Sequence, residues 1–194
     1  MLAWQRSEAL ECVKFRSMGT EVVVLLPPNH QRDAGRVRSL FEAWDARFSR
    51  FDPSSELSRV NGRAGHAVRV SPVMLEAVRV AVRAAHATNG TFDPLLGARM
   101  IELGYDRTFA TIDPRPRPAS GWVPVRWEAI EIDQPAGSLR IPQRTALDLG
   151  GIAKGMAVDA AIADLRGAGI AHAGVNAAAI SRSTARHPAR ATGR

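Results

Sequence analysis

Residues 147–155 read Leu-Asp-Leu-Gly-Gly-Ile-Ala-Lys-Gly, and they give the strongest indication of how this chain folds. An apolar run reaches Asp148, two glycines follow, and an alanine-rich pattern of helical period continues to Leu165. The pattern predicts a strand over 145–149, a tight turn at the glycines and then an α-helix. Glycines let a backbone approach a ligand closely, and a helix start offers unpaired N–H groups that suit a phosphate.

Lys154 adds a positive charge close to the predicted helix start. It and Lys14 are the only lysines among the 26 lysines and arginines of the chain. Two interpretations stay open on this segment alone: a phosphate-binding turn, or an ordinary connection between strand and helix with a solvated lysine. The spacing matches neither GxxxxGK[ST] nor GxGxxG, the two common phosphate-binding patterns.

The composition is that of one globular domain. The chain has 194 residues, 45% of them hydrophobic, which is enough for a substantial core. No apolar run approaches the roughly 20 residues that a membrane-spanning helix needs. The N-terminus mixes charged with apolar side chains, and Cys12 lacks the small-residue context of a lipoprotein signal. We therefore expect no signal peptide, no membrane span and a cytoplasmic location.

The net charge of +7 does not indicate nucleic-acid binding. Much of the basic excess lies in residues 181–194, where four arginines occur without an acidic residue. Elsewhere arginines are interleaved with acids, as on an ordinary solvated surface. No stripe of aromatic and basic residues suggests a surface for stacking bases, so we expect no nucleic-acid partner.

Apolar periodicity and capping signals predict the remaining elements. Helices are expected over 33–48, 56–61 and 72–87, the last after a Ser-Pro start signal. A hairpin is expected from strands at 130–132 and 138–141, and the proline-rich residues 113–124 predict an irregular connector or a loop at the rim of the site. Interleaved helices and strands together with the hairpin favour an α+β fold.

Three further motifs accompany the Gly-Gly segment. They are Met18-Gly19-Thr20, FSRFDPSSELSRVN at 48–61 and TNGTFDPLLG at 88–97. With DLGGIAKGMAVD at 148–159, they resemble the ApbE family, the FAD:protein FMN transferases. The family patterns look like MGT, S-x-[FY]-x-x-x-S-x-[LI]-x-x-x-N, G-x-F-D-P and D-x-x-x-x-x-KG-x-x-x-D. Each pattern alone is weak, but the four in this order make the resemblance specific.

The resemblance implies an α+β, ApbE-like flavin transferase fold, of which residues 1–177 would form the N-terminal part of a larger layered domain. It implies an Mg²⁺-dependent transfer of FMN from FAD to a Ser or Thr hydroxyl of a target flavoprotein, with release of AMP. FAD as substrate, target flavoproteins as partners and Mg²⁺ as cofactor are therefore expected. In phosphoryl transfer of this kind, positioning and charge neutralisation dominate.

The resemblance also assigns residues to the FAD site. Met18 and Phe51 would line it, with Phe51 placed to pack on a flavin or adenine ring. A second loop in contact with FAD would be formed by Thr91, Phe92 and Asp93.

The Gly-Gly segment would serve the same site. Asp148 would hold FAD or the glycine turn, Lys154 would face the phosphates, and the backbone carbonyl of Gly151 would be a metal ligand. Ser55 and Asn61 are expected to cap and fix their loop rather than touch substrate. No residue is assigned a catalytic role.

The chain departs from the family pattern after Ala177. The family continues from VNA into GGD, whereas this chain continues with Ala178-Ala179-Ile180 and an Arg-, Ser- and Thr-rich end. With GC-rich codons, one G inserted after the codon of Ala177 would turn the next four residues into Gly-Gly-Asp-Leu. We therefore expect residues 178–194 to be a frameshifted, disordered tail.

Two functions stay open. The first is the flavin transferase, with little or no activity in the chain as written, because the family's other Mg²⁺ ligands, an Asp and a Thr side chain, would lie in the missing part. The alternative is a non-catalytic flavin- or nucleotide-binding protein, or an inert fragment.

Overall fold

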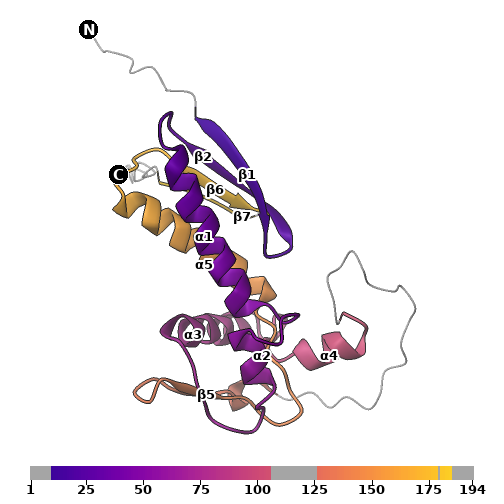
Figure 1. The fold of residues 1–194 in the computed structure, drawn as a ribbon. Helices are drawn as coiled ribbons and strands as arrows, with labels where there is room; N and C mark the ends of the chain where they lie inside the picture. The colour runs from indigo at the N-terminus through magenta and orange to yellow at the C-terminus, as the bar shows by residue number, and fades with distance from the viewer. Residues whose placement is uncertain (1–9, 106–125, 179, 185–194) are drawn as a thin grey trace, which may run out of the picture. The chain divides into compact units, whose positions relative to one another are not determined.

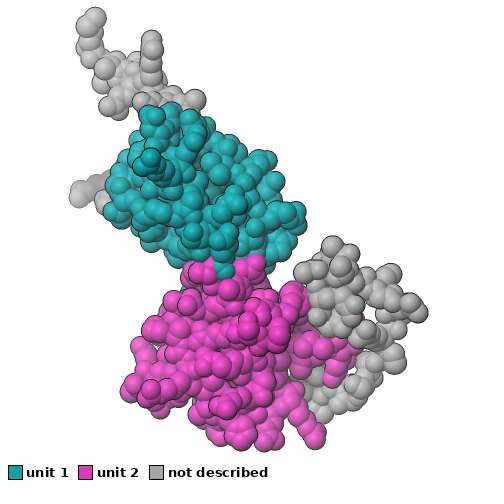
Figure 2. Space-filling view, viewed as in Figure 1, with its two compact units in different colours: residues 1–42, 154–194 teal, residues 43–153 magenta. Residues whose placement is uncertain are grey.

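The computed structural model describes residues 10–105, 126–178 and 180–184. They form two compact units, with the described residues up to 42 and from 154 onward in the first and those from 43 to 153 in the second (Figure 2). The boundaries between the units fall within two long helices, α1 (Gln31–Phe48) and α5 (Gly150–Gly167). The predicted connector over 113–124 and the tail from residue 185 lie outside the described residues.

The first unit is built on a four-stranded antiparallel sheet in the order β1-β2-β6-β7 (Figure 1). Its strands are β1 (Glu11–Ser17), β2 (Thr20–Leu26), β6 (Gly174–Ala177) and β7 (Ile180–Ser183). Met18 and Gly19 form the two-residue turn between β1 and β2, with φ values of 50° and 73°. Positive φ at both positions is typical of the type I′ turn, whose twist matches that of a hairpin.

One face of this sheet carries the core of the first unit. Val22, Val24 and Leu26 alternate inward and are 0–1% exposed, as the period of a β-strand requires. Helix α1 covers this face through Phe41, whose ring meets that of Phe15 edge-on at a centroid distance of 5.8 Å. Helix α5 adds its own apolar stripe, which includes Ala157, Val158, Ala161, Ile162 and Leu165.

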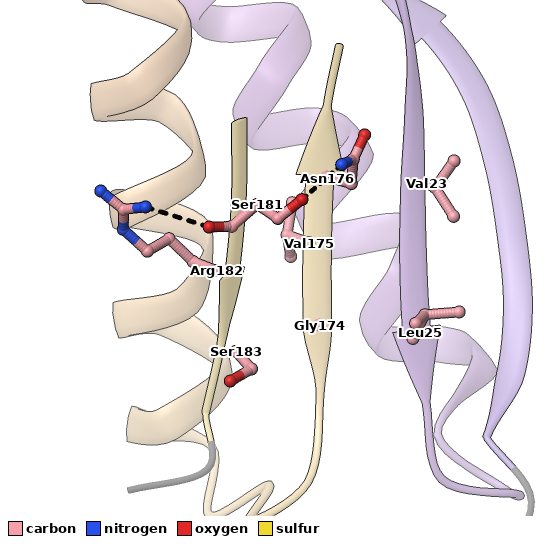
Figure 3. Close-up of a pocket in the computed structure, with 8 residues that line it drawn as sticks. All are labelled: Val23, Leu25, Gly174, Val175, Asn176, Ser181, Arg182 and Ser183. Atoms are coloured by element: carbon pink, nitrogen blue, oxygen red, sulfur yellow. Dashed lines mark hydrogen bonds between the residues drawn. The ribbon is translucent and has the colours of Figure 1, made fainter. Parts of the chain in front are cut away.

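The opposite face of the sheet is open and forms a groove of about 620 Å³ (Figure 3). Val23 and Leu25 of β2 lie on this face, and Leu25 is 37% exposed. From the neighbouring strands, Asn176 and Ser181 point toward one another and are hydrogen bonded. None of the residues assigned to the FAD site lines this groove.

Strand β7 lies where the sequence predicts a disordered tail, so the structure differs from that expectation over Ile180–Ser183. Its backbone pairs with β6, and the next residue, Thr184, closes the end of the pair. The Thr184 N–H donates to Ala173 O at 2.8 Å, and the Ala173 N–H donates to Thr184 Oγ1 at 2.6 Å. Backbone pairing of this kind needs no apolar period, which is why the pattern of side chains did not indicate it.

The turn between β6 and β7 places an alanine in a conformation that favours glycine. Ala177 pairs with Ile180, so the loop has two residues, and the first of them, Ala178, has a φ of 59°. The left-handed region costs a residue with a Cβ about 1–2 kcal/mol.

The second unit contains helices on a small sheet. After the end of α1 come α2 (Glu56–Asn61), α3 (Pro72–Ala87), α4 (Gly97–Glu102) and the short 3₁₀ helix η2 (Trp127–Ala129). The sheet has the order β3-β5-β4 and consists of β3 (Val68–Arg69), β4 (Glu131–Asp133) and β5 (Ser138–Arg140).

Local signals located these helices well. Ser71 caps α3 by accepting the N–H of Met74 at 3.2 Å, and Pro72 occupies the first turn. The predicted helices over 56–61 and 72–87 are confirmed at those bounds, and α1 begins two residues before the predicted start of 33. None of the helices within the described ranges is long and apolar enough to cross a membrane.

The prediction of a strand and a tight turn before α5 is wrong. Residues 145–149 make only one isolated bridge, between Ala146 and Leu96, and belong to no strand. Neither Gly150 nor Gly151 has a positive φ, and both already lie in the first turn of α5. The helix begins directly after the extended segment because other parts of the second unit satisfy the backbone of that segment.

Candidate functional site

Asn61, the last residue of the 48–61 motif, holds the extended segment before α5. Its Nδ2 donates to Leu147 O at 3.0 Å, and the Leu147 N–H donates to its Oδ1 at 2.8 Å. The side-chain amide thereby takes the place of a neighbouring strand, which satisfies two backbone groups of a fully buried residue. Asn61 has a structural role, as expected, but it fixes the Leu147 segment rather than its own loop.

The 88–97 motif binds the same segment from another direction. The N–H of Asp148 donates to Pro94 O and the N–H of Gly97 donates to Ala146 O, both at 2.9 Å. A Cβ on Gly97 would lie 2.7 Å from Ala146 O and 2.8 Å from Leu147 O, both backbone atoms. Only glycine allows the two chains to approach so closely.

The side chains of the second predicted loop have different surroundings. Asp93 Oδ1 accepts the N–H of Leu95 at 2.8 Å, so this carboxylate shapes its own turn. The ring of Phe92 lies against α5, since a Cβ on Gly151 would be 3.2 Å from Phe92 Cε2. Thr91 is exposed, next to Phe92 in the chain. The structure therefore brings Phe92 and Gly151 together and leaves Thr91 facing solvent.

Asp148 uses both of its carboxylate oxygens within the protein. Oδ1 accepts the N–H of Gly150 at 2.8 Å, and Oδ2 lies 3.1 Å from Nη1 of Arg50. Of the two roles expected for Asp148, holding FAD or holding the glycines, these contacts support the second.

Arg50 is a residue of this site that sequence reasoning missed. Its guanidinium carbon lies 4.8 Å from the centroid of the Phe51 ring, in addition to the ion pair with Asp148. Phe51 is 42% exposed, which is unusual for a large apolar side chain and suits a ring-stacking role. The only signal in the sequence was the position of Arg50 next to Phe51 in the motif. The contact between Arg50 and Asp148 depends on the tertiary fold, so the sequence did not indicate it.

The turn that carries Phe51 is fixed by local hydrogen bonds. Ser55 is 2% exposed, caps α2 by accepting the Ser58 N–H at 2.9 Å, and donates to Ser49 O at 2.6 Å. This confirms its capping role. Asp52 Oδ1 accepts both the hydroxyl and the N–H of Ser54, and these two hydrogen bonds hold the pKa of Asp52 below its usual value.

The two other predicted site residues belong to the first unit. Met18 is half-buried in the β1–β2 turn, and Lys154, also half-buried, is the fifth residue of α5. The second unit contains the remaining six: Phe51, Thr91, Phe92, Asp93, Asp148 and Gly151.

Gly151, through its backbone carbonyl, is the only residue of this chain that was expected to bind the metal ion. Within residues 10–105, 126–178 and 180–184, no group of three or more His, Cys, Asp or Glu side chains could hold a metal ion. Because Mg²⁺ takes about six oxygens in octahedral geometry, these residues do not by themselves fit a magnesium site.

Comparisons with known proteins agree with the motifs. The model of the ApbE family matches residues 18–187, and no curated protein sequence matches at a significant level. Among solved structures, the ApbE protein of Thermotoga maritima MSB8 is 21% identical with a TM-score of 0.76, over 90% of this chain and 59% of that one. The apo form of Pseudomonas stutzeri flavinyl transferase ApbE has the same identity and TM-score, 21% and 0.76, over 97% of this chain and 64% of that one.

A third structure, the flavin transferase ApbE from Vibrio cholerae, is 24% identical with a TM-score of 0.70, over 90% of this chain and 59% of that one. These likenesses confirm the predicted α+β, ApbE-like fold. The chain spans about 60% of the length of these relatives.

Proposed function

Because this chain belongs to the ApbE family, we propose that it derives from an FAD:protein FMN transferase and carries the flavin-binding part of that enzyme. The reaction would cut FAD at its pyrophosphate and pass FMN to a Ser or Thr hydroxyl of a target flavoprotein. The single observation that carries the proposal is the junction of three family motifs around residues 145–151. There Asn61, Gly97 and Pro94 hold one extended segment between them.

This junction explains why the motifs contain residues that need not touch a substrate. Asn61 and Gly97 are required so that the start of α5 lies beside the loop of Phe92. In the same motif as Asn61, the ring of Phe51 is 42% exposed and offers a surface on which a flat heteroaromatic ring can stack. A site whose chemistry depends on positioning needs residues that hold its segments in place, as Asn61 and Gly97 do.

The proposed transfer is a displacement at phosphorus. The hydroxyl oxygen of the target attacks the phosphorus of the FMN half, the bond from that phosphorus to the bridging oxygen breaks, and AMP leaves with that oxygen. The hydroxyl proton passes to solvent or to the departing AMP. In this scheme Phe51 would stack on a ring of FAD, the 91–93 loop would contact FAD, and Lys154 would neutralise phosphate charge.

No step of the proposed transfer is assigned to Mg²⁺. The family resemblance implies an ion that would neutralise pyrophosphate charge when bound, but the described residues do not form its site. We propose that any magnesium dependence needs ligands beyond Gly151.

The test is a transfer assay with a flavoprotein domain that carries a Ser or Thr acceptor. Residues 1–194, and in parallel the version with the reading frame restored after Ala177, are incubated with FAD, with and without Mg²⁺. Covalent flavin on the acceptor and a matching amount of AMP are expected from the frame-restored protein. AMP release without any covalent flavin would instead indicate an FAD hydrolase.

A second function, non-catalytic binding of a flavin or nucleotide, is favoured by one observation. The described residues hold no group of three or more His, Cys, Asp or Glu side chains that could bind a metal ion. Saturable FAD binding with neither AMP nor covalent flavin, also after frame restoration, would support this second function.

A further inference from the structure

We propose that Arg50 is a positioning residue of the flavin site, which sets the ring of Phe51 and the first turn of α5 relative to each other. The inference rests on the function proposed above, because it assigns the surface between those two elements to a flavin. It concerns residues of the second unit only.

Arg50 lies between two partners. Its side chain is 18% exposed, which is low for an arginine, and reaches Asp148 on one side and Phe51 on the other. The distances are 3.1 Å from Nη1 to Asp148 Oδ2 and 4.8 Å from the guanidinium carbon to the ring centroid. A planar guanidinium can pair with a carboxylate and stack on a ring at the same time.

Asp148 connects Arg50 with the start of helix α5. The carboxylate that pairs with Arg50 through Oδ2 accepts the Gly150 N–H through Oδ1 at 2.8 Å. Gly150 is the first residue of α5, so the orientation of this carboxylate helps to fix the start of the helix, together with the backbone contacts of the segment before it. Arg50 fixes that orientation because it occupies the other oxygen.

The ring of Phe51 is the second partner of Arg50. Phe51 is 42% exposed, and without a neighbour it would occupy more than one rotamer. The guanidinium lies over one face of the ring and restricts it, which leaves the other face for a ligand. Arginine thus prepares a stacking surface before the ligand arrives, and this lowers the entropy lost on binding.

Arg50 has few other partners within reach. Its Nη1 is buried and, among the described residues, makes no hydrogen bond beyond the ion pair with Asp148. The side chain also borders a cavity of about 120 Å³ that Asn61 and Leu147 help to line, which has room for water. A partly buried cation of this kind is held close to its counter-ion, so Arg50 connects Asp148 with the ring of Phe51.

The experiment uses residues 1–194 and three variants. Arg50→Ala removes both contacts, and Arg50→Lys retains a charge for Asp148 but cannot lie flat on the ring. The control is Arg79→Ala, which removes an exposed ion pair with Glu76 at 3.1 Å in the same unit. For each protein, FAD affinity is measured by quenching of flavin fluorescence, stability by urea denaturation, and exchange of the Gly150 amide hydrogen by NMR.

We expect Arg50→Ala to weaken FAD binding about tenfold or more and to accelerate Gly150 amide exchange about tenfold. Arg50→Lys should keep Gly150 exchange as slow as in the unchanged chain but bind FAD clearly more weakly. If Arg50 acted only as a structural ion pair, the two quantities would change together. Arg79→Ala should change neither quantity by more than about twofold.

The outcomes separate this inference from the proposed function. If the unchanged chain binds FAD and Arg50→Ala binds it equally well, the positioning role is overturned and the proposed function stands. If the unchanged chain binds no FAD but Gly150 exchange still follows Arg50, the proposed function fails while the control of the helix start by Arg50 stands. If neither FAD affinity nor Gly150 exchange responds to Arg50→Ala, the inference is overturned.

Discussion

The side-chain amide of Asn61 binds the backbone of Leu147 through two hydrogen bonds, of 3.0 and 2.8 Å, between residues 86 positions apart in the sequence. This one residue connects α2 with the segment that enters α5. Because Leu147 is fully buried, its N–H and C=O lose their protein partners if Asn61 is removed, and only water in the adjoining cavity of about 120 Å³ could replace them.

Asn61→Ala should therefore lower the free energy of unfolding by about 2–4 kcal/mol, since two buried backbone groups lose their partners. Asn61→Asp should be similarly harmful, because a carboxylate oxygen would face Leu147 O in place of the donor. Urea denaturation measures both effects, with the exposed Gln134→Ala as control. A loss below about 0.5 kcal/mol for Asn61→Ala would show that the segment is held by other contacts.

Gly97→Ala should destabilise the second unit by about 1–3 kcal/mol or more, because the new methyl group would meet two backbone oxygens that cannot move aside. The matched control is Gly35→Ala on α1, where a Cβ meets nothing within 4 Å. There the same change should stabilise by about 0.5–1 kcal/mol, as alanine does in a helix. The two variants are compared by thermal and urea denaturation, and equal effects would refute the packing argument.

Ala178→Gly should stabilise the first unit by up to about 1 kcal/mol, because glycine adopts the φ of 59° without strain. Ala163→Gly, an exposed position within α5, should lose about 1 kcal/mol and serves as the control. Glycine at position 178 is also what the restored reading frame would encode. Destabilisation by Ala178→Gly would argue against the left-handed turn between β6 and β7.

Lys154→Ala in the frame-restored protein should weaken FAD binding by about 1.5–3 kcal/mol, the contribution of a charge-assisted contact with phosphate, and leave the fold intact. Calorimetry measures the FAD affinity, and circular dichroism checks that the variant is folded. Lys14→Ala is the control, since Lys14 is 59% exposed and pairs with Glu21 on the surface. If both variants bind FAD as well as the unchanged protein, Lys154 is an ordinary solvated lysine.

Millimolar Mg²⁺ should change the FAD affinity of residues 1–194 by less than about twofold, because the described residues offer no cluster of metal ligands. Calorimetry with FAD in the presence of Mg²⁺ or of EDTA checks this expectation. Strong Mg²⁺-dependent binding, or robust transfer of flavin, by this chain alone would show that it supplies a complete ligand set.

The sequence by itself determined the elements whose cause is local. Helix α3 has its cap at Ser71, Pro72 in its first turn and a continuous apolar stripe, so all its signals lie within about 16 neighbouring residues. The order of the four motifs and the α+β class were likewise predictable from the sequence.

Only the tertiary structure decided how the motifs are used. The apolar residues before Gly150 looked like a strand, yet their partners are an amide side chain and a loop, which no hydrophobic period describes. Strand β7 forms through backbone pairing with β6, which its Ile-Ser-Arg-Ser sequence does not predict. Arg50 looked like a surface arginine because its counter-ion, Asp148, is distant in the chain. Hydrophobic periodicity and capping residues reflect interactions between sequence neighbours. The contacts of Asn61, β7 and Arg50, in contrast, join segments that meet only after the chain has folded.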